Sequence, residues 1–212
     1  MSKQKPVSIS VIRRLPRYYR FLGELLKLDI HRISSGELAK RMGLTASQIR
    51  QDLNCFGGFG QQGYGYNVEL LHNEIGNIVG VNNKNKIILI GVGNLGRAIG
   101  TQMKFETRGF ELIGAFDIDE SLTGTQLKNL TIMHIDSLED FCNRHHPTAA
   151  MLCIPKTSAQ ELSEKLVSYG IKAFWNFSHY DLTQHLPDVV VENVHLGDSL
   201  LTLSCKLHNT IE

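Results

Sequence analysis

Three glycines stand at the spacing Gly91-x-Gly93-x-x-Gly96, directly after an apolar run that ends at Ile90 and directly before a helical pattern. In that position the first glycine permits a tight turn, the second lets the backbone approach a pyrophosphate, and the third allows close packing of helix on strand. The amides of a helix N-terminus also favour anions. We therefore predict a dinucleotide site made by Gly91, Val92, Gly93, Asn94, Leu95 and Gly96.

A carboxylate strengthens this prediction. Asp117 lies 21 residues after Gly96, at the end of the next apolar run, where it can accept hydrogen bonds from a ribose and repel a 2′-phosphate. Asp119 adds negative charge and no arginine follows closely, so NAD(H) is favoured over NADP(H) as the cofactor. Two other interpretations stay open at this point: a glycine turn in an empty α/β domain, and an S-adenosylmethionine site, which also uses an acid at a strand end.

A second group of residues has the chemistry of DNA recognition. Residues 46–56 predict a helix whose first half exposes polar side chains, and Gln and Arg pair with adenine and guanine edges in the major groove. These candidates for DNA bases are Ser47, Gln48, Arg50 and Gln51. On a preceding helix, Arg13, Arg14 and Arg17 are candidates for phosphate contacts. The alternative is a solvated polar face on a small helical bundle.

The elements around this helix form a winged-helix pattern. Residues 8–28 show helical periodicity, with Pro16 expected to kink the helix or to begin a new first turn. The spacings Ser34…Glu37 and Thr45…Gln48 each predict a capped helix start, separated by Gly43. Five glycines between 57 and 65 predict a hairpin, which would carry the DNA-contacting side chains Gln61, Gln62 and Tyr64. With a further helix over residues 68–79, residues 1–80 make the DNA-binding domain.

From residue 86 the periodicity changes. Short continuous apolar runs at 87–90, 112–116, 149–154 and 171–175 alternate with helical stretches at 95–105, 138–145 and 158–169. This alternation predicts an α/β fold with a doubly wound parallel sheet of the Rossmann type over residues 81–192. Residues 193–212 then form a terminal helix, with leucines at 196, 200, 203 and 207 on one stripe.

The composition excludes several classes of protein. Residues 1–80 carry 11 basic and 6 acidic side chains, whereas the remainder carries 11 and 15, so the excess of positive charge lies in the predicted DNA-binding half. No signal peptide or membrane-spanning run is present, and four scattered cysteines suggest no disulfide framework, so we expect a cytoplasmic protein. His145 and His146 suit a helix end rather than a metal site. Among the four cysteines, Cys55 is a candidate for an oxidation sensor, because it lies near the end of the helix predicted over residues 46–56.

No catalytic residues are predicted. The 132 residues after the boundary suffice for a nucleotide-binding domain and leave no substrate domain. The Tyr-x-x-x-Lys pair of short-chain dehydrogenases is absent, since Tyr169 and Lys172 are one residue too close. The alternative is a small NAD-dependent oxidoreductase with an accessory helical domain.

These motifs together resemble the Rex family of redox-sensing transcriptional repressors. The similarity runs in order along nearly the whole chain, through segments 12–20, 46–53, 56–66, 91–98, 116–117, 154–155, 173–177 and 191–194. It implies a homodimer that binds double-stranded operator DNA at an inverted repeat when NADH is scarce and that NADH releases. It implies that the protein neither binds a membrane nor acts on a protein substrate. It also implies a last helix swapped into the partner subunit, and it places Pro155 and Asn176 at the cofactor.

The chain departs from its relatives at two places. Basic residues of many relatives are replaced by Gln51, Gln61 and Gln62. A Tyr–Asp contact that links the cofactor to an arginine of the first helix is replaced by Gln102 and His195, while the arginine is kept as Arg20. We expect Gln102 and His195 to lie at the cofactor and to form a weaker, pH-dependent latch. Alternatively, both residues merely fill space at the subunit contact.

Overall fold

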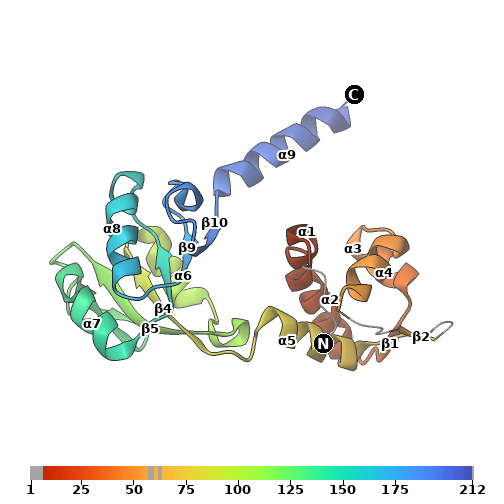
Figure 1. The fold of residues 1–212 in the computed structure, drawn as a ribbon. Helices are drawn as coiled ribbons and strands as arrows, with labels where there is room; N and C mark the ends of the chain where they lie inside the picture. Colours follow the sequence, from red (N-terminus) through yellow and green to blue (C-terminus); the bar gives the residue numbers. More distant parts are fainter. Residues whose placement is uncertain (1–6, 57–59, 62–63, 212) are drawn as a thin grey trace. The chain divides into compact units, whose positions relative to one another are not determined.

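The computed structural model describes residues 7–56, 60–61 and 64–211. The chain divides into two compact units, an N-terminal unit of residues 1–82 and a C-terminal unit of residues 83–212 (Figure 1). Residues that the sequence placed in a winged helix lie in the first unit, and those of the predicted Rossmann-type sheet lie in the second.

The N-terminal unit begins with two helices rather than one. α1 (Ile9–Ile12) ends before Arg13, and α2 (Leu15–Lys27) starts afresh with Pro16 in its first turn. Proline is tolerated there because the amide that it lacks would have no partner in the helix. The expectation of a fresh start at Pro16 is therefore confirmed.

Capping side chains set the limits of the next helices. Ser34 accepts a hydrogen bond from the Glu37 amide (3.0 Å) and so begins α3 (Ser35–Met42). Gly43 ends α3 in the left-handed conformation, with φ +63°. Thr45 accepts from the Gln48 amide (3.2 Å) and begins α4 (Ala46–Asn54). Both predicted helix starts are confirmed, and α4 follows α3 after a short turn, as in a helix-turn-helix.

A small antiparallel sheet completes this unit, together with α5 (Val68–Val79). Its strands are ordered β1 (Arg32–Ile33), β3 (Gly65–Asn67) and β2 (Gly60–Gln61). Gly65 has φ +71°, and a Cβ there would lie 2.6 Å from the Ile33 carbonyl oxygen, so a side chain would separate β3 from β1. The pairing of β2 with β3 confirms the predicted hairpin. The core beneath it contains Leu15, Tyr18, Leu22, Leu38 and Ile49.

The C-terminal unit is built on a seven-stranded sheet, parallel except for one edge strand. Its order is β10 (Val190–Asn193), β9 (Ala173–Asn176), β8 (Ala149–Leu152), β4 (Asn85–Ile90), β5 (Phe110–Asp117), β7 (Leu130–His134) and β6 (Gln126–Leu127). Only β6 runs antiparallel to its neighbour. The chain starts in the middle of the sheet and winds outward to both sides, so the predicted fold class is confirmed.

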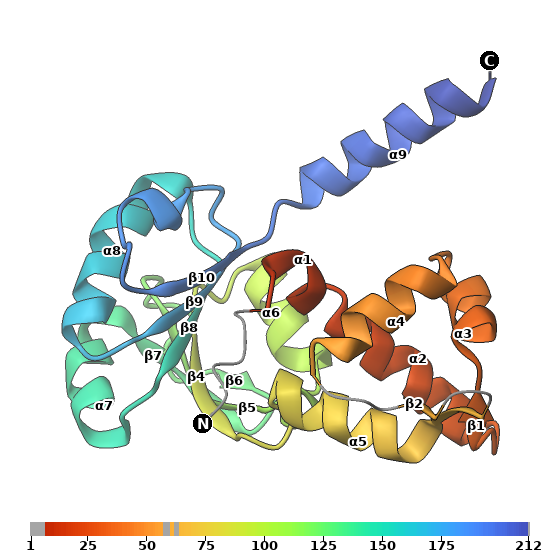
Figure 2. The same cartoon turned by 45° about the vertical axis from the view of Figure 1, so that its right-hand side comes forward.

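Alternate side chains of the central strands face opposite layers. Ile88 and Ile90 belong to the core under α7 (Leu138–His145) and α8 (Lys156–Ser168), whereas Ile87 and Leu89 face α6 (Asn94–Gln102). Figure 2 shows α7 and α8 on one side of the sheet and α6 on the other. Burial on both faces explains why these strands are continuous apolar runs in the sequence.

Several boundaries differ from the prediction. α6 ends at Gln102 rather than at residue 105, because Met103 is extended (φ −78°, ψ 137°) and carries Phe105 into the core. β9 begins at Ala173 rather than at residue 171, although Ile171 is buried. The sequence analysis gave no residue ranges for β6, β7 and β10. Short 3₁₀ turns lie at Glu106–Arg108, Ile135–Ser137 and Leu182–Gln184.

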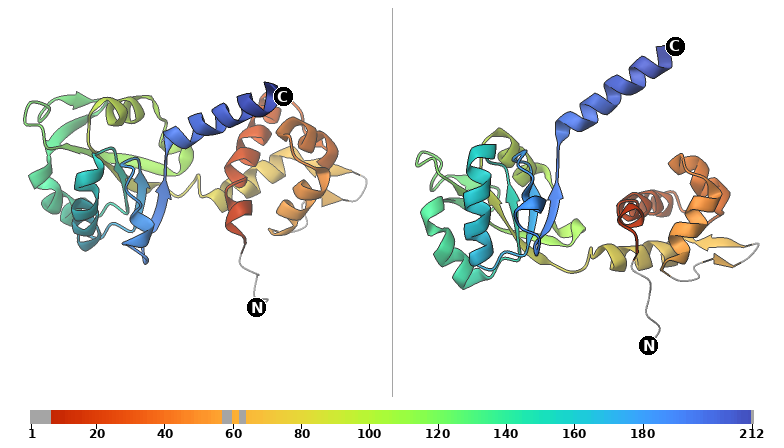
Figure 3. Two further views of the ribbon diagram at one scale, coloured as in Figure 1. Left: turned by 90° about the horizontal axis from the view of Figure 1, so that it is seen from above. Right: turned by 45° about the horizontal axis from the view of Figure 1, so that its top comes forward.

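The last helix of the chain exposes its side chains over residues 196–209, where the structure describes their burial. α9 (Leu196–Ile211) follows β10 as one continuous helix (Figure 3). Every residue from 196 to 209 is exposed, and Leu200 and Leu203 are 68% and 53% accessible. A helix with such an apolar stripe is expected to be covered by another surface.

Candidate functional site

The turn between β4 and α6 has the geometry that the three glycines require. Gly91 has φ +89°, and a Cβ there would lie 2.5 Å from the Cys153 carbonyl oxygen. A Cβ on Gly96 would lie only 1.9 Å from the carbonyl oxygen of Gly91, so α6 can pack this close to the turn only with glycine. A Cβ on Gly93 would meet nothing within 4 Å, so the backbone there is open to a ligand.

Asp117 stands beside this turn at the end of β5. Its Oδ2 accepts a hydrogen bond from the Val92 amide (2.6 Å), and its Oδ1 accepts one from the Asp119 amide (3.0 Å). These two bonds fix the half-buried carboxylate while leaving each oxygen a further lone pair. Hydrogen bonds from Ser121 lower the pKa of the exposed Asp119 carboxyl, so a second negative charge stays near the turn.

A pocket of about 240 Å³ opens over this edge of the sheet. Its lining includes Gly91, Gly93, Asp117, Cys153 and Pro155. Gly93 precedes α6 and, as a glycine, has no side chain that could cap the first amides of the helix, those of Asn94 and Leu95. Burial raises the pKa of the Cys153 thiol to about 12, so this cysteine is a neutral lining residue and not a nucleophile. The arrangement can hold a diphosphate at the helix start and a ribose at Asp117.

Of the residues that the sequence assigned to the cofactor, Gly91, Gly93, Asp117 and Pro155 line this pocket. Val92, Asn94, Leu95 and Gly96 belong to the turn and the start of α6 but not to the lining, and Asn176, Gln102 and His195 lie outside the turn altogether. Asn176 is 1% exposed and fastens the end of β9, with its amide donating to the Tyr180 carbonyl (2.6 Å) and to Asn193 Oδ1 (2.8 Å). Gln102 is exposed at the far end of α6, about 12 Å from the first turn at 1.5 Å per residue. His195 lies just before α9.

His195 instead forms a pair with another histidine. Its Nδ1 lies 3.3 Å from Nδ1 of His179, and the two rings stack at 5.5 Å. His179 has φ +60°, an uncommon conformation for a residue with a side chain. The contact lies between the loop after β9 and the start of α9. The sequence analysis did not single out His179, because nothing in its local pattern marks the contact.

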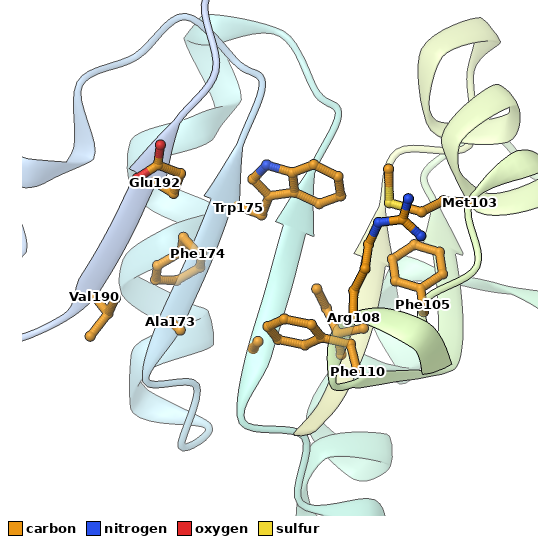
Figure 4. A pocket seen from close by; sticks show the side chains of 11 residues that line it. Met103, Phe105, Arg108, Phe110, Ala173, Phe174, Trp175, Val190 and Glu192 are labelled. Atoms are coloured by element: carbon orange, nitrogen blue, oxygen red, sulfur yellow. The ribbon is translucent and has the colours of Figure 1, made fainter. Parts of the chain in front are cut away.

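A second, apolar hollow of about 310 Å³ lies on the α6 side of the sheet, over β8, β9 and β10 (Figure 4). Its lining includes Met103, Phe105, Phe110, Trp175 and Val190, and Val190 is 72% exposed. Neither α6 nor α9 covers this part of the sheet. It is therefore an apolar surface without a partner inside the chain's own C-terminal unit.

In the N-terminal unit, α4 presents one polar face to solvent. Its exposed residues are Ser47, Arg50, Gln51 and Asn54, which follow the spacing i, i+3, i+4, i+7 and so lie on one side of the helix. The sequence analysis named the first three and missed Asn54, which the same spacing could have found. Arg50 donates to the Ser35 hydroxyl at 3.1 Å, which ties this face to the start of α3.

Two other residues that the sequence assigned to DNA turn inward. Arg14 donates from Nε and Nη2 to the two oxygens of Asp52, at 2.6 and 2.8 Å, and Gln48 donates its amide to the same carboxylate at 2.8 Å. The sequence analysis assigned no role to Asp52, which is 1% exposed.

The remaining candidates for DNA contact are on the surface or outside the described residues. Arg13 is exposed, and Arg17 is exposed while donating to the Met42 carbonyl. Tyr64 is 69% exposed. Gln62 and the side chain of Gln61 lie outside the described residues.

Other site types find no support in the described part of the chain. Among those residues, no group of three or more His, Cys, Asp or Glu side chains could hold a metal ion. No helix within the described ranges is long and apolar enough to cross a membrane. Cys55 is exposed and its thiol donates to the Gln51 carbonyl at 3.4 Å, which leaves the oxidation-sensor hypothesis open.

Comparison with known proteins relates both units to characterised families. Residues 6–54 match a family described as "Putative DNA-binding protein N-terminus", and residues 82–180 match one described as "CoA binding domain". The redox-sensing transcriptional repressor Rex of Caldanaerobacter subterraneus subsp. tengcongensis is 56% identical over 209 residues, covering 98% of this chain and 92% of the relative. The Rex of Clostridium botulinum strain Hall is 50% identical, and the match covers 99% of this chain and 100% of that relative.

Solved structures of similar sequence lead to the same group. A crystal structure of RSP in complex with β-NAD⁺ and operator DNA is 51% identical, covers 97% of this chain and 94% of that chain, and gives a TM-score of 0.88. A structure of RSP in complex with β-NADH is 50% identical in sequence, covers 97% of this chain and 96% of that chain, and gives a TM-score of 0.89. RSP is described as a Rex-family repressor.

Proposed function

Because the chain belongs to the Rex family of redox-sensing transcriptional repressors, we propose that it binds operator DNA when NADH is scarce and leaves the DNA when NADH binds. Its relatives are named as repressors, and it is not an enzyme. The observation that carries the proposal is the presence in one chain of a helix-turn-helix with an exposed polar face on α4 and a glycine turn beside Asp117. We expect it to act in the cytoplasm.

The pocket at the β4–α6 turn is the proposed NAD(H) site. RSP was crystallised with β-NAD⁺ and with β-NADH. In this chain the open backbone at Gly93 and the first amides of α6 would hold the diphosphate, and Asp117 would accept hydrogen bonds from the adenosine ribose. The nicotinamide ring supplies redox sensing through its two oxidation states. Gly91, Gly96 and Pro155 shape this pocket.

The exposed face of α4 is the proposed DNA-reading surface. RSP was crystallised with operator DNA. Arg13, Arg17 and the wing would contact phosphates, while side chains on α4 read base edges. Because a dimer places two such helices about 34 Å or a multiple apart, we expect an inverted repeat to be required and a single half-site to bind weakly.

We propose that the functional unit is a homodimer in which α9 lies on the partner subunit. The chain leaves two apolar surfaces uncovered, the leucine stripe of α9 and the hollow lined by Phe105, Phe110 and Trp175. Exchange of α9 between two copies would bury both surfaces at once. Sedimentation should give a dimer for the wild type and a monomer or unfolded chain for Leu200→Glu/Leu203→Glu. A dimer that survives both charges would contradict the exchange.

The direct test of the proposed function is a titration with both ligands. An operator selected from random-sequence DNA by the wild-type protein is bound, and NADH, NAD⁺ or coenzyme A is added while binding is followed by fluorescence anisotropy. We expect NADH to release the DNA at lower concentration than NAD⁺, and coenzyme A to have no effect. Failure to select any sequence, or release by coenzyme A alone, would contradict the proposed function.

A further inference from the structure

The side of α4 that faces away from solvent carries a buried acidic residue. Among the residues that the structure describes, Asp52 is the one carboxylate in the buried class, at 1% exposure. Its two oxygens accept four hydrogen bonds, from Nε and Nη2 of Arg14, from the Tyr18 hydroxyl (2.9 Å) and from the Gln48 amide. We call these four residues the Asp52 network. It joins the recognition helix α4 to the start of α2, 34 and 38 residues earlier in the chain.

The network is charged. Burial alone would raise the pKa of the Asp52 carboxyl, but hydrogen bonds from Arg14, Gln48 and Tyr18 and the charge of Arg14 hold it below its usual range. The hydrogen bond that Arg14 donates to Asp52 in turn raises the pKa of the Arg14 guanidinium. A buried ion pair contributes little net stability compared with apolar residues of similar size, but removing one partner is strongly destabilising. Its bidentate geometry, however, fixes the relative position of the two helices.

The bonds also limit what Arg14 and Gln48 can do. The side-chain amide of Gln48 donates to a carboxylate four residues along the same helix, so it points along the inner side of α4 and not toward the exposed face. Two nitrogens of Arg14 are held by the carboxylate. Gln51, three residues after Gln48, is exposed together with Ser47, Arg50 and Asn54, whereas Gln48 is only partly exposed.

We propose that the Asp52 network sets the orientation of the recognition helix, so that Arg14 and Gln48 are positioning residues, and that the operator bases are read by Ser47, Arg50, Gln51 and Asn54. The inference rests on the proposed DNA-binding function and assigns the residues within it. It is carried by the geometry of four short hydrogen bonds to one buried carboxylate.

A matched pair of glutamines tests which residue reads a base. The variants Gln48→Met and Gln51→Met remove the amide at nearly constant size. Affinities are measured for the selected operator and for every single base-pair change within one half-site. Because a bidentate base contact is worth about tenfold or more in discrimination, Gln51→Met should lose the preference at one base pair. Gln48→Met should change all affinities by the same factor. A base preference lost in Gln48→Met and kept in Gln51→Met would overturn the proposal.

A matched pair of arginines tests the phosphate contacts. Each lost contact flattens the plot of log affinity against log salt concentration by about 0.9. Arg14→Met should weaken binding with an unchanged slope, whereas Arg13→Met should flatten it. A flattened slope in Arg14→Met would show that its guanidinium reaches DNA and would overturn its assignment.

A double variant separates orientation from stability. Asp52→Asn is expected to weaken operator binding, but it could do so by unfolding the unit. In Arg14→Met/Asp52→Leu both charges are gone and the packing is apolar, so stability should return close to that of the wild type. Operator affinity should stay at least about tenfold lower if the network positions α4. Recovery of wild-type affinity together with stability would overturn the positioning role. A wild type that selects no DNA would overturn the proposed function as well, whereas these variant results concern the network alone.

Discussion

The two candidate sites of the molecule are built differently. In the N-terminal unit the candidate DNA surface consists of side chains on the exposed face of α4, and a buried ion pair between Arg14 and Asp52 fixes the opposite side of that helix. In the C-terminal unit the candidate nucleotide pocket is shaped mainly by backbone. The three glycines matter because they lack a side chain: the backbone turns sharply at Gly91, stays open at Gly93 and packs closely at Gly96. At Asp52 and Arg14 the charge and the hydrogen-bonding geometry matter. The two regions should therefore respond to different changes, added volume in one and altered charge in the other.

Adding a methyl group at the turn should have the largest effect. In Gly96→Ala the new Cβ would meet the Gly91 carbonyl oxygen at 1.9 Å, so α6 must move away from the turn. We expect NADH affinity, measured by calorimetry, to fall by roughly a hundredfold, the upper end of the usual cost of overpacking. Operator binding in the absence of NADH should persist.

Gly36→Ala in α3 is the matched control, since a Cβ there would meet only the Ser34 hydroxyl oxygen at an ordinary 3.9 Å and Gly36 lies outside the C-terminal unit. Thermal unfolding of both variants shows whether the C-terminal unit still folds. Unchanged NADH affinity in folded Gly96→Ala would mean that the pyrophosphate does not bind at this turn.

Removing the carboxylate at the pocket should have the next largest effect. With Asp117 and Asp119 at the end of β5, NADH should bind at least about tenfold more tightly than NADPH, because one repelled charge is worth about 1.4 kcal/mol. Asp117→Ala should narrow this preference and weaken NADH, since the ribose loses its acceptor. Equal affinities of the wild type for both cofactors, measured by calorimetry, would contradict the assignment of the pocket.

The difference between the regions also explains what could be predicted from the sequence. The glycine turn is local, because strand, three glycines and helix occupy consecutive positions and the strand-end acid follows at a regular distance. The sequence could therefore predict that Gly91 and Asp117 lie beside each other. The Asp52 network depends on residues 34 and 38 positions apart that meet only after α2 packs on α4. From the sequence, Arg14 and Gln48 therefore had the side-chain chemistry of DNA contacts and nothing to indicate that they face inward.

Acid should weaken the N-terminal network, because that network depends on the charge of the Asp52 carboxylate. Because the pKa of Asp52 is lower in the folded protein, its contribution to stability is full above the carboxyl's ordinary range and is lost as the pH falls through the lowered value. Amide hydrogen exchange in peptides covering α2 and α4 should accelerate between pH 5 and 3 more in the wild type than in Asp52→Asn, after correction for intrinsic exchange. Parallel curves for the two proteins would mean that Asp52 is not charged in the folded state.

The smallest effect is expected for changes to the coupling between NADH binding and operator binding. The latch that the family resemblance implies at Gln102 and His195 lacks a carboxylate, and His195 instead contacts His179 through Nδ1 atoms 3.3 Å apart. In such a contact one ring nitrogen donates and the other accepts, and neither ring carries the fixed negative charge of a carboxylate.

We therefore expect saturating NADH to weaken operator binding by only a few-fold in the wild type, at the low end of typical couplings between sites. His179→Ala removes the contact and should reduce this factor further. His195→Asp should increase it, because the substitution restores the carboxylate that the family resemblance implies at this position. If the factor is large and the same in all three proteins, the two histidines fill space and the coupling runs through other residues.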